Sequence, residues 1–201
     1  MNSIQLRWER NAGNHPIVPT EGTYTFVDLE WAPDEPLNDY HFISVSPTGI
    51  IYLPLSKSHE WVLATRLTVG LANPLGKTID LLPNKRFYSG GATSMRGFKR
   101  RKLGPLDSNE APLGGEAKLE GAAELRFPLF SIFRGTWFID TGQVWPTVDD
   151  IIFNEFEMAT GLGLWINTMF GPLRGDLAYR LTDFEKTQPQ WVFHFSIGPA
   201  F

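Results

Sequence analysis

The stretch 118-KLEGAAELRF-127 alternates between two kinds of side chain at every second position. Successive side chains of a β-strand point to opposite faces, so this stretch predicts a strand with one apolar and one charged face. The apolar side carries Leu119, Gly121, Ala123, Leu125 and Phe127, and the charged side carries Lys118, Glu120, Ala122, Glu124 and Arg126.

The same alternation recurs along most of the chain. In 173-LRGDLAYRL-181 the large apolar residues lie opposite Arg174, Asp176 and Arg180. In 191-WVFHFSIGPAF-201 large residues again share one side, and helical spacing is hard to find anywhere. The sequence therefore predicts an all-β protein of about nine strands. The expected strands are residues 3–10, 23–31, 41–55, 61–72, 118–127, 134–145, 156–167, 173–181 and 191–201.

The composition suits one β domain over residues 1–201 and excludes several functions. The chain has 201 residues, of which 42% are hydrophobic, enough for one domain with its own interior. The formal net charge of −4 argues against a nucleic-acid partner. The chain has no cysteine, and its four histidines lack metal-ligand spacing. We therefore expect no metal and no cofactor.

The connections between the expected strands alternate in length. Counting back from the C-terminus, TDFEKTQPQ and PTVDDIIFNE are long, whereas TMFG and LFSI are short. Outer-membrane barrels have short periplasmic turns and longer external loops, and a soluble β-sandwich has no reason for this alternation. Aromatic residues near strand ends, such as Trp61 and Trp145, favour membrane interfaces. The sequence predicts a transmembrane antiparallel β-barrel, with a soluble β-sandwich binding module as an alternative.

Residues 73–116 form one long connection, and a connection of this size is usually functional or disordered. It contains 90-GGATSMRGFKRRKLGP-105, in which Gly90 and Gly91 allow unusual backbone conformations and Met95 and Phe98 are apolar anchors. The stretch lacks the Gly-Lys-Ser/Thr ending of a phosphate-binding loop. The basic run 99–102 is interpreted as solvated, with lipopolysaccharide or substrate contact as the alternative.

Several motifs occur in the order found in a known family. They are RFYSGGATSMRGFKRRKLGP, LGGEAKLEGAAELRFPL, WFIDTGQVW, GLGLWINTMFGPLRGDLAYRL and WVFHFSIGPAF. Together they resemble the C-terminal barrel of the bacterial surface-antigen superfamily of outer-membrane assembly factors, which includes BamA, TamA and the two-partner secretion transporters. The stretches FHFSIGP and GPLRGDLAY are most similar to the TamA-like members.

The resemblance implies a role for the long loop. In that family a loop with an aliphatic-Arg-Gly-aromatic tetrad folds back into the barrel, where its arginine meets acidic residues of the inner wall. The tetrad corresponds to Met95, Arg96, Gly97 and Phe98. Methionine stands where the family usually has valine or isoleucine, and it is also flexible and apolar. The acidic partners would be Asp140 and Glu124.

The strand pattern allows this pairing independently. Asp140 is in phase with Phe138 and opposite Trp137, so it should face the lumen, and Glu124 lies on the charged face of the preceding strand. Two inward carboxylates on neighbouring strands repel each other unless a cation lies between them. A guanidinium suits this position because its planar fork can serve both carboxylates.

The resemblance also implies a function without enzymatic chemistry. We expect a barrel protein of the bacterial-type outer membrane that helps to insert or translocate other proteins. Its expected partners are outer-membrane lipid, client barrel or secreted proteins, and periplasmic domains or partner subunits missing from this chain. A passive pore or structural barrel is the alternative.

Two further expectations concern the C-terminus and the size of the chain. Phe193, Phe195, Ile197 and Phe201 share a face and resemble the aromatic C-terminal signal of outer-membrane barrels. The resemblance implies a sixteen-stranded barrel preceded by soluble periplasmic domains. We therefore expect this chain to be the C-terminal part of such a barrel, a fragment of a larger protein.

Overall fold

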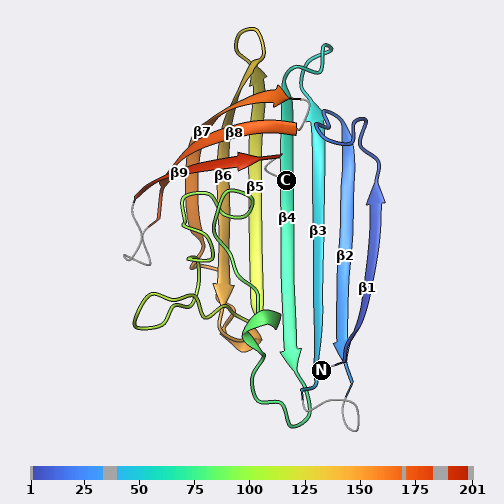
Figure 1. The fold of residues 1–201 in the computed structure, drawn as a ribbon, viewed down its shortest axis with the longest axis vertical. Coiled ribbons are helices and arrows are strands. Elements are labelled where there is room, and N and C mark those ends of the chain that lie inside the picture. The colour runs from blue at the N-terminus through green and yellow to red at the C-terminus, as the bar shows by residue number, and fades with distance from the viewer. Residues whose placement is uncertain (1, 34–39, 169–170, 183–189, 199–201) are drawn as a thin grey trace.

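The computed structural model describes residues 2–33, 40–168, 171–182 and 190–198. They form a single nine-stranded antiparallel sheet in which the strands are neighbours in sequence order (Figure 1). The strands are β1 (Ile4–Asn11), β2 (Gly22–Ala32), β3 (Phe42–Pro54), β4 (Val62–Pro74), β5 (Ala117–Pro128), β6 (Phe133–Trp145), β7 (Glu157–Thr168), β8 (Gly171–Arg180) and β9 (Trp191–Ile197). Two short 3₁₀ helices, η1 (Pro83–Lys85) and η2 (Val148–Asp150), lie in the connections.

The all-β prediction is confirmed, and the strand boundaries differ by a few residues from those expected. The first strand, for example, covers Ile4–Asn11 instead of residues 3–10. The described strands belong to one sheet, not to two packed sheets, so the soluble β-sandwich alternative is wrong. Within the described ranges, no helix is long and apolar enough to cross a membrane.

The two faces of the sheet differ sharply in chemistry. On the outer face large apolar side chains are open to the surroundings: Leu162 is 64% exposed, Phe193 68% and Phe195 65%. The inner face buries charged residues, among them Glu124, Asp176 and Arg180. A contiguous apolar outer face around a polar interior is the arrangement of a transmembrane barrel.

The two ends of the sheet carry different connections. At one end, here called the turn end, lie residues 12–21, 55–61 and 129–132; at the other, the loop end, lie residues 75–116 and 146–156. This is the expected alternation except at residues 12–21, which form a longer connection. They fold over the mouth of the sheet, where the carbonyl of Pro19 accepts a hydrogen bond from Arg126 of β5 at 3.5 Å.

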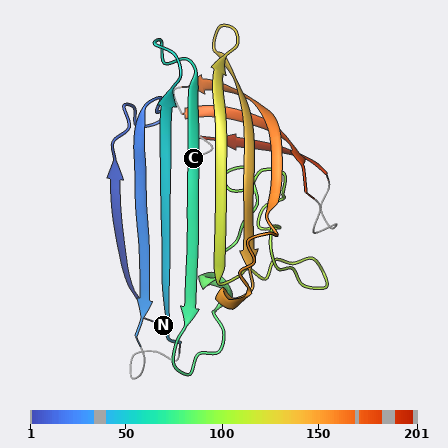
Figure 2. The same ribbon diagram turned by 180° about the vertical axis from the view of Figure 1, so that it is seen from behind.

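Residues 75–116 return along the concave side of the sheet. Figure 1 shows this connection, in green, in front of β5 and β6, on the side to which β7, β8 and β9 curve; Figure 2 shows the same relation from behind. The backbone groups of Phe87 and Gly115 pair at the base of the loop. Beyond that point the chain reaches the inner wall and buries Met95, Arg96 and Phe98.

Candidate functional site

Arg96 is almost completely buried against the inner wall and bonds to two carboxylates. Its Nε donates to Asp140 Oδ2 and its Nη2 to Asp140 Oδ1, each at 2.7 Å. Its Nη1 donates to Glu124 Oε2, also at 2.7 Å, and its backbone N–H adds a bond to Asp140 Oδ2 at 3.0 Å. The guanidinium thus forms a bidentate pair with one carboxylate and a single bond with another.

The register of β5 and β6 explains why these carboxylates converge. Asp140 lies opposite Ala122, and Glu124 lies opposite Phe138, so both carboxylates are diagonal neighbours on the inner face. Phe138 lies on the same face, and the carbon Cζ of Arg96 lies 3.5 Å from the centroid of its ring. The alternation of both strands therefore builds a guanidinium site with an aromatic floor.

Glu124 has more partners than sequence reasoning assigned to it. Besides Arg96, it accepts from Nε of Arg126 at 2.8 Å and from both terminal nitrogens of Arg174, at 3.0 and 2.5 Å. Arg174 also donates its Nε to Asp176 at 2.6 Å. The alternation of the sequence already placed Arg126, Arg174 and Asp176 on the charged faces of their strands.

The charges in this cluster balance. Arg96, Arg126 and Arg174 lie among Glu124, Asp140 and Asp176, and all six residues are buried. Burial alone lowers the pKa of the Arg96 guanidinium, but the neighbouring charges of Asp140 and Glu124 outweigh burial and raise that pKa above its usual value. The loop arginine therefore remains charged when it is docked.

Gly97 and Phe98 extend the contact of the loop towards β7, β8 and β9. Gly97 has a φ of +97°, and a Cβ placed there would lie 2.6 Å from the Cβ of Ala159 on β7, so only glycine fits. Its N–H donates to Nε2 of His194 on β9 at 3.3 Å. Phe98 is fully buried, and the guanidinium carbon of Arg180 lies 5.1 Å from its ring centroid. Met95, Phe98, Leu103 and Ala159 form one apolar cluster.

A second group of bonds holds the loop to β4 and β5. Arg66 donates to the carbonyls of Thr93 and Ser94, each at 2.6 Å. The hydroxyls of Ser89 and Ser94 both donate to Glu120, the former at 2.5 Å. The neighbouring Gly90 and Gly91 both have positive φ angles, which let the chain turn sharply before the tetrad. Sequence reasoning did not identify Arg66 or Glu120 as loop partners.

The remaining predicted residues lie elsewhere. Phe193, Phe195 and Ile197 share the outer face of β9, as their alternation indicates, whereas Phe201 lies outside the described residues. In the basic run, Lys99, Arg100 and Arg101 are exposed. The described part of the chain contains no cluster of His, Cys, Asp or Glu suited to a metal ion.

A sheet with an apolar exterior, a charged interior and a loop docked inside it through a buried arginine defines a membrane β-barrel that is braced from within. The chain belongs to the Omp85 superfamily, whose domain description matches residues 1–201.

Three similar proteins illustrate the relationship. The outer membrane protein assembly factor BamA of Neisseria meningitidis serogroup B is 28% identical, over 96% of this chain and 28% of that protein. A SAM50-like protein of Schizosaccharomyces pombe is 32% identical, over 63% of this chain and 26% of its own length. The crystal structure of BamA from Haemophilus ducreyi lacking POTRA domains 1–3 has a TM-score of 0.81 at 22% identity, covering 95% of this chain and 41% of that one. The chain thus spans less than a third of the length of these two curated relatives.

Proposed function

We propose that this chain is the C-terminal part of an outer-membrane barrel that helps to insert or translocate other proteins. The observation that carries the proposal is the docked loop, which the bonds of Arg96 to Asp140 and Glu124 attach to β5 and β6 from inside. The name of the Neisseria relative, outer membrane protein assembly factor BamA, supports an outer-membrane location and an assembly role. The role is non-enzymatic.

The edges of the sheet supply the means of acting on a client. Within the described residues, β1 pairs only with β2 and β9 only with β8, so each presents one row of backbone donors and acceptors. An extended client segment can add to such an edge as a further strand. The strands that complete the barrel would come from the rest of a longer protein or from a partner subunit.

The orientation follows from the connections. The turn end faces the periplasm and the loop end faces outward, because short periplasmic turns and longer external loops are the rule in such barrels. Outer-membrane lipid contacts the apolar face of β1–β9, and client proteins and periplasmic domains are the remaining partners. We treat residues 1–201 as one barrel domain; its inward loop, expected at residues 73–116, begins at residue 75 because β4 extends to Pro74.

Within the superfamily we also propose that this chain is most closely related to the TamA-like members. The proposal rests on the stretches GPLRGDLAY and FHFSIGP, whereas the similar proteins described above carry BamA and SAM50 names. This relationship is tested by placing residues 86–201 in the corresponding part of a TamA-type barrel and of a BamA-type barrel. Better assembly of the TamA-type hybrid is expected, and better assembly of the BamA-type hybrid would contradict it.

Reconstitution into liposomes separates the proposed function from a passive pore. The liposomes are given an unfolded outer-membrane barrel client, and client folding and ion conductance are both measured. We expect accelerated client folding relative to empty liposomes. Conductance without any acceleration would support the passive-pore alternative instead.

A crosslinking experiment tests the proposed edge directly, and the chain suits it because it has no cysteine. Ser196→Cys on β9 should form a disulfide with a cysteine in the terminal strand of a client under mild oxidation. Thr65→Cys on the central strand β4 is the control and should not react. Equal crosslinking at both positions would indicate nonspecific contact.

A further inference from the structure

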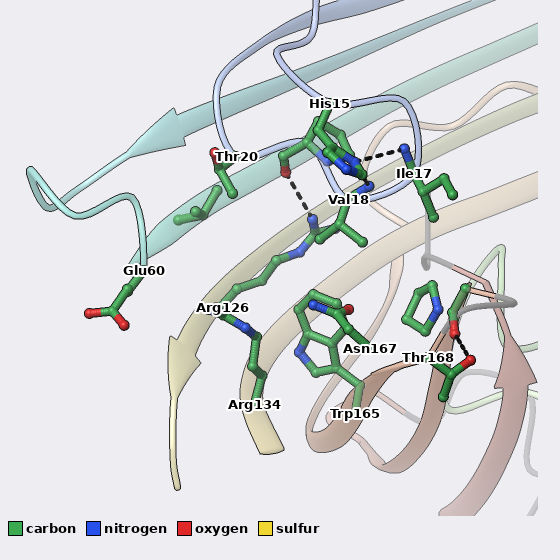
Figure 3. Close-up of a pocket in the computed structure, with 14 residues that line it drawn as sticks. His15, Ile17, Val18, Thr20, Glu60, Arg126, Arg134, Trp165, Asn167 and Thr168 are labelled. Carbon is green, nitrogen blue, oxygen red and sulfur yellow. Dashed lines mark hydrogen bonds between the residues drawn. The ribbon is translucent and has the colours of Figure 1, made fainter. Parts of the chain in front are cut away.

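A cavity of about 330 Å³ lies at the turn end of the inner wall and borders the Arg96 cluster, with which it shares Arg126 (Figure 3). The connection of residues 12–21 covers it on one side, and strands β4 to β8 supply most of the remaining lining. Its size is at the lower end of small-molecule sites. The residues that bear on its chemistry are Val18, Pro19, Arg126, Arg134, Trp165 and Pro172.

The cavity carries a positive charge that no carboxylate among the described residues balances. In the neighbouring cluster three arginines match three carboxylates, and Arg126 is one of the three. Arg134 is a further cation, half-buried on β6, and it forms no ion pair or side-chain hydrogen bond with any described residue. Glu60 also lines the cavity, but it is exposed, and Figure 3 shows its carboxylate pointing away from the arginines.

An unsatisfied donor lies beside this charge. Trp165 is only 5% exposed, and its indole N–H has no acceptor among the described residues. Trp165 is the cross-strand neighbour of Arg134, and the guanidinium carbon of Arg126 lies 5.8 Å from its ring. A buried donor without a partner is costly, so such a position is suited to an acceptor that comes from outside the chain.

The other walls are apolar or already bonded. Ile17, Val18, Pro19 and Pro172 supply apolar surface. The Nδ1 atom of His15 already accepts from the N–H groups of Ile17 and Val18, at 3.2 and 3.0 Å. The cavity therefore combines an apolar wall with cationic and neutral donors on one side.

We infer that this cavity binds a carboxylate carried on an apolar group, with the carboxylate accepting from Trp165 and Arg134 and the apolar group lying against Val18 and Pro172. A planar carboxylate can accept bonds from a guanidinium and an indole at the same time. The C-terminal hydrophobic residue of a peptide and a short fatty acid share this chemistry. This inference does not rest on the proposed function.

The test uses the whole chain folded in detergent, with ¹⁵N-labelled indole groups followed by NMR. N-acetylphenylalanine and octanoate are the two carboxylate probes, N-acetylphenylalanine amide is the uncharged control, and inorganic phosphate is the simple anion. The Trp165 signal is assigned by its loss in Trp165→Phe. We expect both carboxylates to shift this signal saturably and the amide to bind about tenfold more weakly, or worse, because a charged acceptor is lost.

Matched variants locate the site. Arg134→Gln should weaken carboxylate binding about tenfold. Arg10→Gln, an exposed arginine at the same end that does not line the cavity, should leave binding unchanged. Far-UV circular dichroism confirms that each variant is folded, and Arg134 is partly exposed, so its replacement removes little packing.

Four results would overturn the inference. They are no shift of the Trp165 signal with either carboxylate, equal binding of the acid and its amide, phosphate binding as tight as that of the carboxylates, and equal effects of Arg134→Gln and Arg10→Gln. If only one of the two carboxylates binds, the inference holds and the bound probe identifies the source as peptide-like or lipid-like.

Discussion

The N–H of Gly97, at the tip of the inward loop, donates to Nε2 of His194 on β9 at 3.3 Å. This bond connects the loop to the last described strand of the sheet, whereas Arg96 connects it to β5 and β6. The loop therefore contacts both the middle and the edge of the described sheet. Docking of the loop and the position of the edge strand are coupled through two adjacent residues.

Replacing His194 tests this coupling. His194→Leu should lower the free energy of unfolding in detergent by about 1–3 kcal/mol, because the buried Gly97 N–H loses its acceptor. His194→Gln, which can still accept, should cost less. His59→Asn, at the turn end and away from the loop, is the control. Equal stability of the leucine and glutamine variants would contradict a role for the hydrogen bond.

The pair Arg96 and Asp140 can be tested by a double-mutant cycle. Either Arg96→Ala or Asp140→Ala should cost about 3–5 kcal/mol, because each leaves an uncompensated buried charge. The double variant should cost less than the sum of the two, with a coupling of about 0.5–3 kcal/mol, as measured by urea unfolding. Strict additivity would mean that the two side chains do not interact.

A steric prediction concerns Gly97. Gly97→Ala should destabilise the docked loop by about 1–3 kcal/mol, because its φ of +97° disfavours a side chain and the new methyl group meets Ala159. Ala159→Gly should restore part of this loss by removing the methyl group that clashes. Protease sensitivity of the loop is the readout. Absence of any rescue would show that backbone strain alone causes the effect.

Replacing the carboxylate of Glu124 by an amide should lower the stability of the protein more than the same replacement at Asp176. Glu124→Gln removes the charge shared by three arginines, whereas Asp176→Asn removes the charge that pairs with Arg174. We expect the glutamine variant to cost several kcal/mol, about 3–5 by the usual penalty for breaking a buried pair, and the asparagine variant to cost less. Thermal unfolding in detergent compares the two, and the reverse order would contradict the shared-anion arrangement.

The outer face of β7 can be tested for contact with lipid. Leu162→Arg should cost about 2–4 kcal/mol for folding into a bilayer if the position lies near the midplane, because the charge would face hydrocarbon. Glu110→Arg in the loop, also exposed, is the control and should have little effect. Folding into vesicles from urea measures both, and a neutral effect of Leu162→Arg would argue that this face meets water.

The sequence was enough to predict the residues that alternate within a strand. Glu124 and Asp140 could be placed on the inner face because side chains of a strand switch sides at every residue, and this holds whatever the rest of the fold does. The apolar outer positions of β9, such as Phe193, follow from the same rule. The tetrad around Arg96 was found only by resemblance to a family, because the residues that dock a loop do not recur at a regular spacing in the sequence.

The partners that depend on curvature could not be predicted. Arg174 reaches Glu124 although β6 and β7 lie between their strands, and this contact needs the bend of the sheet shown in Figure 1. Arg66 and Glu120 meet the loop because of the path taken by its backbone. The connection of residues 12–21 folds over the turn end, where the carbonyl of Pro19 accepts from Arg126, and no sequence pattern indicates this contact.

The inward loop also bears on the order in which the chain folds. Within the described residues each strand pairs only with its neighbours in sequence, so the sheet can grow one hairpin at a time. The contacts of the tetrad are different: Asp140 lies 44 residues after Arg96, and His194 lies 97 residues after Gly97. Full docking of the loop therefore belongs to the end of folding, after β9 has joined the sheet.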